Sequence, residues 1–566
     1  MIVGIDLGTT NSAVGVFKDG QPVLIPNALG DLLTPSAVSL DEGGRTIVGL
    51  PARERASTHP QLTAQAFKRW MGTDRRITLG RREFRAEELS ALVLQSLRAD
   101  AQAFLGVDVT EAVITVPAYF NEAQRRATRT AGEIAGLRVE RLLNEPTAAG
   151  LAYGIAERPE QATFLVFDLG GGTFDVSVLE HFEGVVQVRA SAGDTRLGGE
   201  DFVDAIGALL AHKAGLTDPD RRDAWLRRRR WWRAAEQAKR DLGQEDAASV
   251  TLDVDGTPRD ITITRGEFEN ASAELCQRIR RPIERALRDA QLDARMLDEI
   301  VLVGGASRMP MIRQLVARLF HRLPLRTIDP DLAIAQGAAV QAGLKARDAA
   351  LHDVVLTDVM PYSLGIISSD RIGERLVGDR FSPIIERNTP VPVSRVCSFS
   401  TVVDQQRALV ADVRQGESPV GSENLGLGVV SIDVPPRPAG EVRVDVRFTY
   451  DVNGLLEVDV QEHESGAARN LVIRSAGSQM SDAEVKAALA KLAALKRHPR
   501  DEEENRYLVE RAKRMYADRL GDERHAIQHG LVQFEAVLER QEPNAIRHAR
   551  KQFREALDSL DGSFRF

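Results

Sequence analysis

Residues 2–16 read IVGIDLGTTNSAVGV, and residues 165–179 read LVFDLGGGTFDVSVL. Each stretch places an Asp-Leu-Gly turn between two apolar runs, so Asp6 and Asp168 occupy the same position in a repeated pattern. Glycines let the backbone approach an anion closely, and an aspartate can hold Mg²⁺ beside phosphate oxygens. One such turn fits an ordinary hairpin, but the repeat with matched flanking strands predicts a duplicated phosphate-binding hairpin.

The composition fits a large protein with several domains. The chain has 566 residues, of which 43% are hydrophobic and 28% charged, and this length predicts roughly three to four domains. Cys276 and Cys397 lie far apart without metal-ligand spacing, so we expect two reduced thiols. The first strand begins at Ile2, and no apolar run approaches the ~20 residues of a membrane span, so we expect a cytoplasmic protein. A net charge of -8 predicts no general attraction to nucleic acid or an anionic membrane.

Two patterns of apolar residues divide most of the chain. Up to about residue 350, short apolar runs alternate with helical spacing, for example at 86–104 and 122–136, which indicates an α/β region. From about 363 to 475 apolar and polar residues alternate, most clearly at 441–464, with a hairpin turn expected at Asn453-Gly454. This second region is therefore predicted to be an antiparallel β domain.

The last part of the chain has a charged helical pattern from about residue 481. Ser481 and Glu484 have the spacing of a capping box, and Pro499 and Pro543 interrupt the pattern. We therefore expect a small helical bundle.

A basic and aromatic stretch at 227–233 permits two interpretations. Four arginines at 227–230 precede Trp231 and Trp232. A basic stripe with aromatic stacking platforms is typical of nucleic-acid binding. An amphipathic helix with solvated arginines and inward tryptophans has the same pattern, and we favour this interpretation.

Six motifs, taken together, carry a resemblance to a known family. They are IDLGTTNS at 5–12, VITVPAYFNEAQR at 113–125, NEPTAAGLAYG at 144–154, DLGGGTFD at 168–175, GDTRLGGEDF at 193–202 and LVGGASRMP at 302–310. In this order they resemble the seventy-kilodalton heat-shock chaperones of the DnaK type, across essentially the whole chain. The segment FSPIIERNTPVPVSR and the short tail look most like the HscC branch of that family.

The resemblance implies a multidomain fold. It consists of a bilobal actin-like (ribonuclease H-like) α/β ATPase domain at 1–352, an interdomain linker at 353–361, an antiparallel β-sandwich substrate-binding domain at 362–478 and a shortened helical lid at 479–566.

The resemblance also assigns catalytic roles. Asp6 and Asp168 would orient a hydrated Mg²⁺, while Lys68, Glu145, Asp175 and Thr173 would act in the hydrolysis of ATP to ADP. A lysine can stabilise charge on a transferring phosphoryl group, and carboxylates can orient water without being strong bases, so slow turnover is expected. The plainer alternatives are turn-stabilising aspartates, a surface lysine on a basic helix and, for Glu145, a helix-start residue.

A further set of residues would bind the nucleotide by the same resemblance. They are Gly8, Thr9, Thr10, Asn11, Gly170, Gly171, Gly172, Glu236, Lys239, Arg240, Gly304, Gly305, Ser307, Arg308 and Asp331. The alternative for Glu236, Lys239 and Arg240 is an exposed charged helix. Gly243 and Leu332 depart from the family pattern, which has a serine and a glutamate there.

The expected peptide-binding and coupling residues follow from the same comparison. The peptide cleft would be lined by Leu364, Ile366, Phe399, Val402 and Leu409, each of which could instead be sandwich core. Coupling between the domains would use Pro117, Arg125, Val354, Val355 and Leu356. Thr357 replaces an expected leucine, and Val402 and Ala411 replace a small residue and an isoleucine, so looser coupling and an altered peptide preference are expected.

The sequence therefore predicts an ATP-driven chaperone that binds unfolded or extended apolar polypeptide. The expected partners are these client polypeptides and a J-domain co-chaperone, whereas the need for a nucleotide exchange factor is left open. The alternatives are a small-molecule kinase of the actin-like fold and an actin-type filament protein, neither of which needs a linker and a β domain. P-loop and dinucleotide enzymes are disfavoured because neither GxxxxGK[ST] nor GxGxxG occurs in the sequence.

Overall fold

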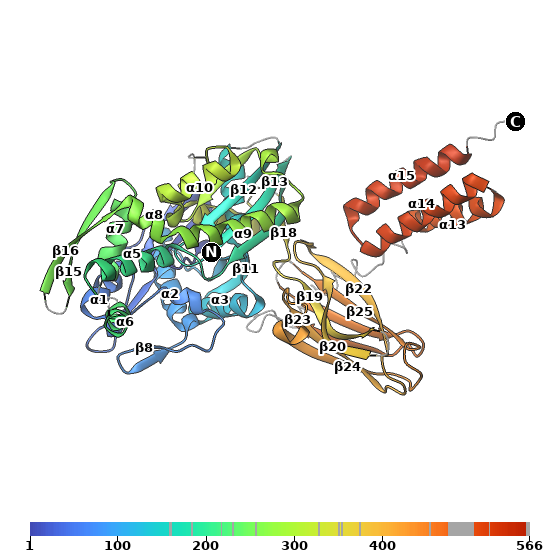
Figure 1. Cartoon of the computed structure of the whole chain (residues 1–566), viewed down its shortest axis with the longest axis horizontal. Helices are drawn as coiled ribbons and strands as arrows, with labels where there is room; N and C mark the ends of the chain where they lie inside the picture. The colour runs from blue at the N-terminus through green and yellow to red at the C-terminus, as the bar shows by residue number, and fades with distance from the viewer. Residues whose placement is uncertain are drawn as a thin grey trace.

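The chain folds into three parts that follow one another in sequence. In Figure 1 the N-terminal α/β part runs from blue to yellow-green, a β sandwich is yellow to orange, and the C-terminal helices are red. The computed structural model describes residues 1–157, 161–182, 185–216, 218–228, 231–254, 257–325, 329–348, 351, 355–372, 375–451, 454–473, 503–519 and 521–561. Over these ranges, none of the helices combines the length and apolarity needed to cross a bilayer.

The N-terminal part contains two related sheets. The first has the order β11 (Arg138–Asn144), β10 (Glu111–Val116), β1 (Ile2–Asp6), β2 (Asn11–Lys18) and β3 (Gln21–Ile25). The second has the order β17 (Glu299–Val303), β12 (Gln161–Leu169), β13 (Phe174–Phe182), β14 (Val185–Asp194), β18 (Val355–Val359) and β21 (Pro390–Val391). In each sheet an antiparallel hairpin, β1–β2 or β12–β13, lies beside a parallel strand, β10 or β17. The repeat in the sequence is therefore a repeat in the structure.

Two helices pack closely beside these sheets. They are α4 (Glu145–Glu157) and α11 (Ala333–Ala346). A Cβ added to Gly337 would lie 1.8 Å from the Ala148 carbonyl oxygen, and one added to Gly4 would lie 2.1 Å from the Ala338 carbonyl carbon. Only glycine permits this separation, and α11 thereby connects α4 with the first sheet. The predicted helices at 86–104 and 122–136 are confirmed as α2 (Ala86–Leu105) and α3 (Glu122–Ile134).

The β sandwich has two four-stranded antiparallel sheets. One has the order β20 (Arg375–Ile385), β19 (Leu364–Ile372), β23 (Ala408–Gln415) and β24 (Leu425–Asp433). The other has the order β22 (Val393–Ser400), β25 (Arg443–Tyr450), β26 (Leu456–Glu462) and β27 (Ala468–Ile473). The alternation predicted at 441–464 is confirmed, since Val444, Val446 and Phe448 are fully buried in the core between the sheets. Gly454 is described at the expected hairpin turn, whereas Asn453 lies outside the described residues.

Part of the expected linker forms a strand of the N-terminal part. β18 runs parallel to β14, with Val355 opposite Val185 and Leu356 opposite Val186. Val354 lies outside the described residues. The segment that leads into the β sandwich is therefore paired with the second sheet, and β21, between β20 and β22, pairs with it in turn.

The C-terminal helices form a bundle with its own core. They are α13 (Glu503–Asp518), α14 (Gly521–Arg540) and α15 (Pro543–Asp561). Phe534 of α14 and Phe553 of α15 are buried and stack with ring centroids 5.0 Å apart. Gln541, between these two helices, donates from Nε2 to the Val396 carbonyl of β22 at 3.3 Å. The predicted interruption at Pro543 is confirmed, since α14 ends at Arg540 and α15 begins at Pro543. Ser481, Glu484 and Pro499 lie outside the described residues.

The tryptophans of the basic stretch pack inward. Trp231 is 3% exposed and lies against Gly207, where an added Cβ would meet its ring at 2.3 Å. Trp232 begins α7 (Trp232–Asp241) and donates from Nε1 to Glu200 at 2.9 Å. This packing supports the amphipathic-helix interpretation. Arg229 and Arg230 lie outside the described residues.

Candidate functional site

A cleft between the two sheets gathers most of the predicted nucleotide-binding residues. It has a volume of about 630 Å³. The predicted residues that line it are Asp6, Gly8, Thr9, Thr10, Asn11, Lys68, Glu145, Asp168, Gly170, Gly171, Thr173, Glu236, Lys239, Arg240, Gly304, Gly305, Arg308 and Asp331. Gly172, Asp175 and Ser307 do not line it but adjoin residues that do. Residues far apart in the sequence therefore converge on one cavity.

The two glycine-rich turns face each other across this cleft. A Cβ added to Gly171 would lie 1.8 Å from Thr10 Oγ1, and one added to Gly172 would lie 2.7 Å from Thr9 Cγ2. Side chains at these glycines would collide with the opposite turn. The backbone amides of both turns can therefore approach a single phosphate chain.

A buried group of carboxylates surrounds one lysine at the base of the cleft. Lys68 Nζ lies 2.7 Å from Glu145 Oε1, and their side chains are 3% and 7% exposed. Lys68 belongs to the short 3-10 helix η2 (Phe67–Trp70), which packs on α2, rather than to a solvated surface helix. Such a buried ion pair needs excellent geometry to offset the desolvation of both charges. The surface-lysine alternative is therefore wrong for Lys68.

Burial changes the protonation of the aspartates in this group. Burial, followed by repulsion from Glu145, raises the pKa of Asp6 to about 7 and the pKa of Asp175 to about 8. The same two causes hold the pKa of Asp168 well above its usual range. Negative charge in this group is thus costly unless a cation compensates for it, and Lys68 lowers the pKa of all three aspartates.

The carboxylates can accept a divalent cation. Asp6 Oδ1 accepts a hydrogen bond from Thr115 Oγ1 at 2.8 Å, whereas the buried Oδ2 of Asp168 has no hydrogen-bond partner among the described residues. Among those residues, no group of three or more histidine, cysteine, aspartate or glutamate side chains is arranged to hold a metal by itself. Mg²⁺ suits such a place, because it is usually held by one or two carboxylates together with water and substrate phosphates.

The other end of the cleft carries charged side chains that pair with one another. Glu236 Oε2 lies 2.6 Å from Lys239, and its Oε1 accepts from Arg240 Nε at 2.9 Å. Glu236, Lys239 and Arg240 therefore fit both interpretations made from the sequence: they pair with one another as on a charged helix, and they also line the cleft. Arg308 Nε donates to Asp331 Oδ2 at 2.9 Å, which fixes the turn after β17.

One chain of hydrogen bonds connects the carboxylate group with the β sandwich through Tyr119. Asp175 Oδ1 accepts from the backbone amide of Tyr119 at 3.1 Å. The Tyr119 carbonyl in turn accepts from the Tyr362 hydroxyl at 3.1 Å, and the two rings lie 4.5 Å apart. Pro117 begins the turn that presents Tyr119, since its carbonyl accepts from the Phe120 amide at 3.1 Å. Asp175 is thus one residue away from a side chain of the sandwich part.

A second connection runs through the residue next to Glu145. Asn144 Nδ2 donates to Asp358 Oδ2 of β18 at 2.8 Å, and Asn144 Oδ1 accepts from Arg125 Nη2 at 2.6 Å. Arg125 also donates from Nε to the Phe120 carbonyl at 3.0 Å. The predicted coupling residue Arg125 is therefore brought together with the strand that leads into the sandwich.

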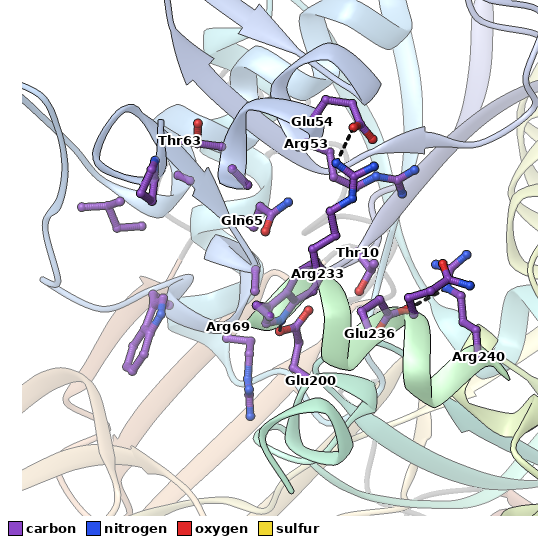
Figure 2. A pocket seen from close by; sticks show the side chains of 18 of the residues that line it. Thr10, Arg53, Glu54, Thr63, Gln65, Arg69, Glu200, Arg233, Glu236 and Arg240 are labelled. Atoms are coloured by element: carbon purple, nitrogen blue, oxygen red, sulfur yellow. Dashed lines mark hydrogen bonds and ion pairs between the residues drawn. The ribbon is translucent and has the colours of Figure 1, made fainter. Parts of the chain in front are cut away.

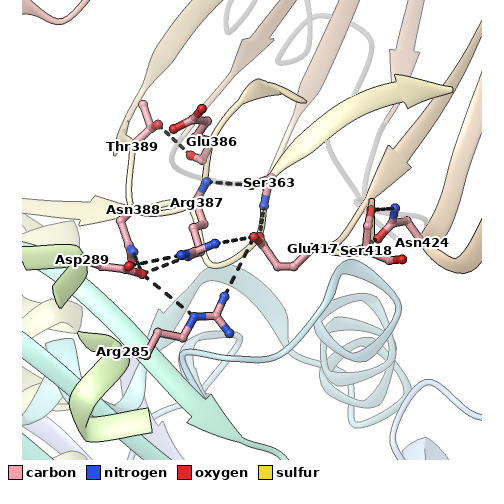
Figure 3. Close-up of polar contacts among 10 residues, drawn as sticks. All are labelled: Arg285, Asp289, Ser363, Glu386, Arg387, Asn388, Thr389, Glu417, Ser418 and Asn424. Carbon is pink, nitrogen blue, oxygen red and sulfur yellow. Dashed lines mark hydrogen bonds and ion pairs between the residues drawn. The ribbon is translucent and has the colours of Figure 1, made fainter. Parts of the chain in front are cut away.

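A charged network holds the sandwich against the second sheet (Figure 3). Arg387, in the loop after β20, donates to both carboxylate oxygens of Asp289 on α9 (Ala273–Ala290), at 2.9 and 3.1 Å. It also donates to Glu417 at 2.6 Å, and Asn388 donates to Asp289 at 2.9 Å. Arg285 of α9 lies within 4.0 Å of Asp289 and 3.9 Å of Glu417. A bidentate arginine fixes the orientation of the two parts as well as their contact.

The residues expected to line a peptide cleft lie at two depths. Leu364, Ile366 and Leu409 are 1%, 2% and 7% exposed and belong to the sandwich core. Phe399 and Val402 are half-buried. In this arrangement of the chain, the first three therefore contribute to packing between the two sheets.

Sequence reasoning missed the residues that connect the cleft with the sandwich. They are Tyr119, Asn144, Asp289, Asp358, Tyr362, Arg387 and Glu417. Tyr119, Asn144 and Arg387 lie inside segments quoted from the sequence, and Asp358 lies in the expected linker, so membership of these segments was an available signal. The others depend on the docking of distant segments, for which no local pattern exists.

The fold and the cleft define a protein with two related lobes around a phosphate-suited cleft, which hydrogen bonds connect to a β sandwich. A family model described as Hsp70 protein matches residues 2–562, nearly the whole chain. The chain therefore belongs to the Hsp70 family. Members of this family are ATP-dependent chaperones that bind ATP or ADP with Mg²⁺, and the match does not distinguish the DnaK and HscC branches.

Proposed function

We propose that this protein hydrolyses ATP in the cleft and uses the nucleotide state to control the binding of extended apolar polypeptide by the β sandwich. One observation supports this proposal above the others. The carboxylates at the base of the cleft adjoin the interdomain contacts, because Asp175 binds the Tyr119 amide and Glu145 directly follows Asn144. A change at the phosphates can therefore shift the contacts of Tyr362 and Asp358.

The residues of the cleft divide the chemistry between them. Mg²⁺, when bound beside Asp6 and Asp168, would neutralise phosphate charge and fix the phosphate chain. Lys68 would stabilise the charge that develops on the transferred phosphoryl group, and Thr173 would donate a hydrogen bond to it. Glu145 and Asp175 would orient the attacking water. The raised pKa of Asp175 suits a group that accepts a proton near neutral pH.

The coupling works because nucleotide favours one of two arrangements of the chain. ATP would favour the docked arrangement seen here, in which β18 pairs with β14 and Arg387 binds Asp289. Hydrolysis would release this contact and let the sandwich hold its peptide, and exchange of ADP for ATP would reverse the change. A ligand can shift such an equilibrium only through a difference in affinity for the two arrangements.

Finer features of the function are proposals from the sequence. They are the HscC-like branch, cytoplasmic location, a J-domain partner, peptide contacts at Phe399 and Val402, and a shortened lid that traps clients weakly. The kinase and filament alternatives are not favoured, because membership of the Hsp70 family spans the sandwich and the helices as well as the two-lobed part.

The experiment that tests the proposal is an ATPase assay with and without an unstructured apolar peptide. We expect slow basal turnover that the peptide accelerates. Tyr362→Phe removes the hydroxyl that binds the Tyr119 carbonyl, so peptide stimulation should fall while the basal rate stays near that of the wild type. Tyr507→Phe, on an exposed tyrosine of α13, is the matched control and should behave as the wild type. Phosphorylation of a sugar without any response to peptide would contradict the proposal.

A further inference from the structure

A second large cavity lies beside the nucleotide cleft and has no role in the function proposed above. It has a volume of about 680 Å³. One wall comes from α1 (Leu50–Thr58), β7 (Thr63–Gln65) and η2, and the opposite wall comes from α7. Figure 2 shows Thr63 and Gln65 on the first wall and Glu236 and Arg240 on the helix opposite. Thr10, Glu236 and Arg240 line both this cavity and the nucleotide cleft, so the two spaces adjoin.

The carboxylates that line this cavity are already engaged. Glu54 lies 2.8 Å from Arg233, and Glu236 binds Lys239 and Arg240 at 2.6 and 2.9 Å. Glu200 accepts from the Trp232 indole at 2.9 Å. These carboxylates therefore make their close contacts with Arg233, Lys239, Arg240 and Trp232, and Glu54 and Glu236 attract Arg53 only at longer range.

Three of the lining arginines have no carboxylate partner among the described residues. They are Arg53, Arg75 and Arg196. Arg53 is half-buried, and its burial, followed by repulsion from Arg240, lowers its pKa. Arg75 lies over the Trp70 ring, 3.7 Å from its centroid, which leaves the edge of the guanidinium available for hydrogen bonds. Arg75 and Arg196 are exposed, whereas Arg53 is half-buried. A hollow whose wall gathers cations without close carboxylate partners favours a bound anion.

A neutral hydrogen-bonding group completes the wall. Gln65 is half-buried, and its side-chain amide has no hydrogen-bond partner within the described ranges. An amide can donate to phosphate oxygens beside a guanidinium, and the planar fork of arginine matches two phosphate oxygens at once. Phosphates carry more charge per group than carboxylates, so several uncompensated arginines favour a phosphate chain.

We propose that this cavity is a second anion-binding site, which takes a phosphorylated small molecule against Arg53, Arg75 and Gln65 while a nucleotide occupies the neighbouring cleft. The ligand contacts both lobes, since Arg53 belongs to α1 and Arg196, which also lines the cavity, follows β14 of the second sheet. Its binding therefore favours the closed arrangement of the lobes and slows the loss of bound nucleotide.

Calorimetry with tripolyphosphate tests this site. The full chain is first saturated with MgADP, and this titration by itself shows whether the nucleotide cleft is functional, so a failure there is distinguished from a failure of the second site. Tripolyphosphate is then added to the ADP-loaded protein. We expect one further molecule to bind, with an affinity that falls steeply as the salt concentration rises.

Substitutions assign the binding to this cavity. Arg53→Gln should weaken tripolyphosphate binding about tenfold or more, because it removes a charge-assisted hydrogen bond, and should leave ADP affinity unchanged. Arg53→Lys retains the charge and should recover part of the affinity. Arg76→Gln, on an exposed arginine that does not line the cavity, is the control and should bind as the wild type. Three results would each overturn the proposal: no binding to the ADP-loaded protein, competition with ADP, or equal binding by Arg53→Gln.

Discussion

Replacing Lys68 by methionine removes the lysine charge from the carboxylate group while keeping most of the side-chain length. Its Nζ lies 2.7 Å from Glu145, and both side chains are less than a tenth exposed. Loss of one partner from a buried ion pair costs about 3–5 kcal/mol in unfolding free energy. Loss of a group that stabilises transition-state charge slows turnover by roughly 10²–10³. We therefore expect Lys68→Met to bind ATP with nearly wild-type affinity and to hydrolyse it at least a hundredfold more slowly.

The stability cost of this change should depend on pH with a definite sign. Lys68 lowers the pKa of Asp6, Asp168 and Asp175, so its loss raises all three. At pH 6 Asp6 and Asp175 of the empty protein, whose pKa values are about 7 and about 8, already carry protons and tolerate the loss, whereas at pH 9 they must ionise without the lysine charge. Urea unfolding should therefore show a larger destabilisation at pH 9 than at pH 6.

The assay is single-turnover hydrolysis of ATP bound before mixing, with affinity measured separately by calorimetry. Lys239→Met is the matched control, because Lys239 pairs with Glu236 at the other end of the cleft. It should weaken ATP binding and leave the hydrolysis of bound ATP within about threefold of the wild type. The reasoning is refuted if Lys68→Met hydrolyses bound ATP at the wild-type rate, or if both variants slow hydrolysis equally.

Three further predictions follow from the contacts described above. The pKa of Asp175 is raised to about 8 by burial and Glu145, so its contribution to the stability of the empty protein is full in acid and is lost as the pH rises from about 4 through about 8. Asp175→Asn should therefore flatten the fall of the unfolding free energy with pH over this interval. An unchanged slope would contradict the assignment. Arg387→Ala removes the hydrogen bonds to Asp289 and Glu417 that hold the sandwich against the second sheet. Small-angle X-ray scattering with ATP bound should therefore show a larger radius of gyration than for the wild type. An unaltered radius would show that the network does not hold the sandwich in place. Gly337→Ala places a Cβ 1.8 Å from the Ala148 carbonyl oxygen, which should lower the unfolding free energy by about 1–3 kcal/mol. Gly266→Ala is the control, because Gly266 has open space around it, and it should not lower the unfolding free energy. Equal effects of the two changes would count against close packing of α4 and α11.

The sequence predicted the features whose chemistry is local. The duplicated Asp-Leu-Gly turns are visible because glycine and aspartate are required at fixed places in each hairpin, and the alternation at 441–464 is visible because it follows the pleat of a strand. Lys68 was different. Its local pattern indicated a surface lysine, and only the family resemblance assigned it to the phosphate site. Its contact with Glu145, 77 positions away, came from the structure.

Contacts between docked parts could not be predicted in the same way. Tyr362 and Tyr119 are 243 positions apart, and Asn144 and Asp358 are 214 apart, so no spacing or periodicity links them. A core residue and a cleft residue also produce the same alternation of apolar and polar residues along a strand. The burial of Leu364 in the sandwich core therefore had to come from the structure.

Amide hydrogen exchange at residues 355–357 tests the central claim most directly, because these amides belong to the strand that joins the cleft to the sandwich. With ATP bound to the hydrolysis-deficient Thr173→Ala variant, we expect slow exchange, since β18 remains paired with β14. With ADP the same amides should exchange much faster. Equal exchange rates in the two nucleotide states would contradict coupling between the nucleotide cleft and the β sandwich.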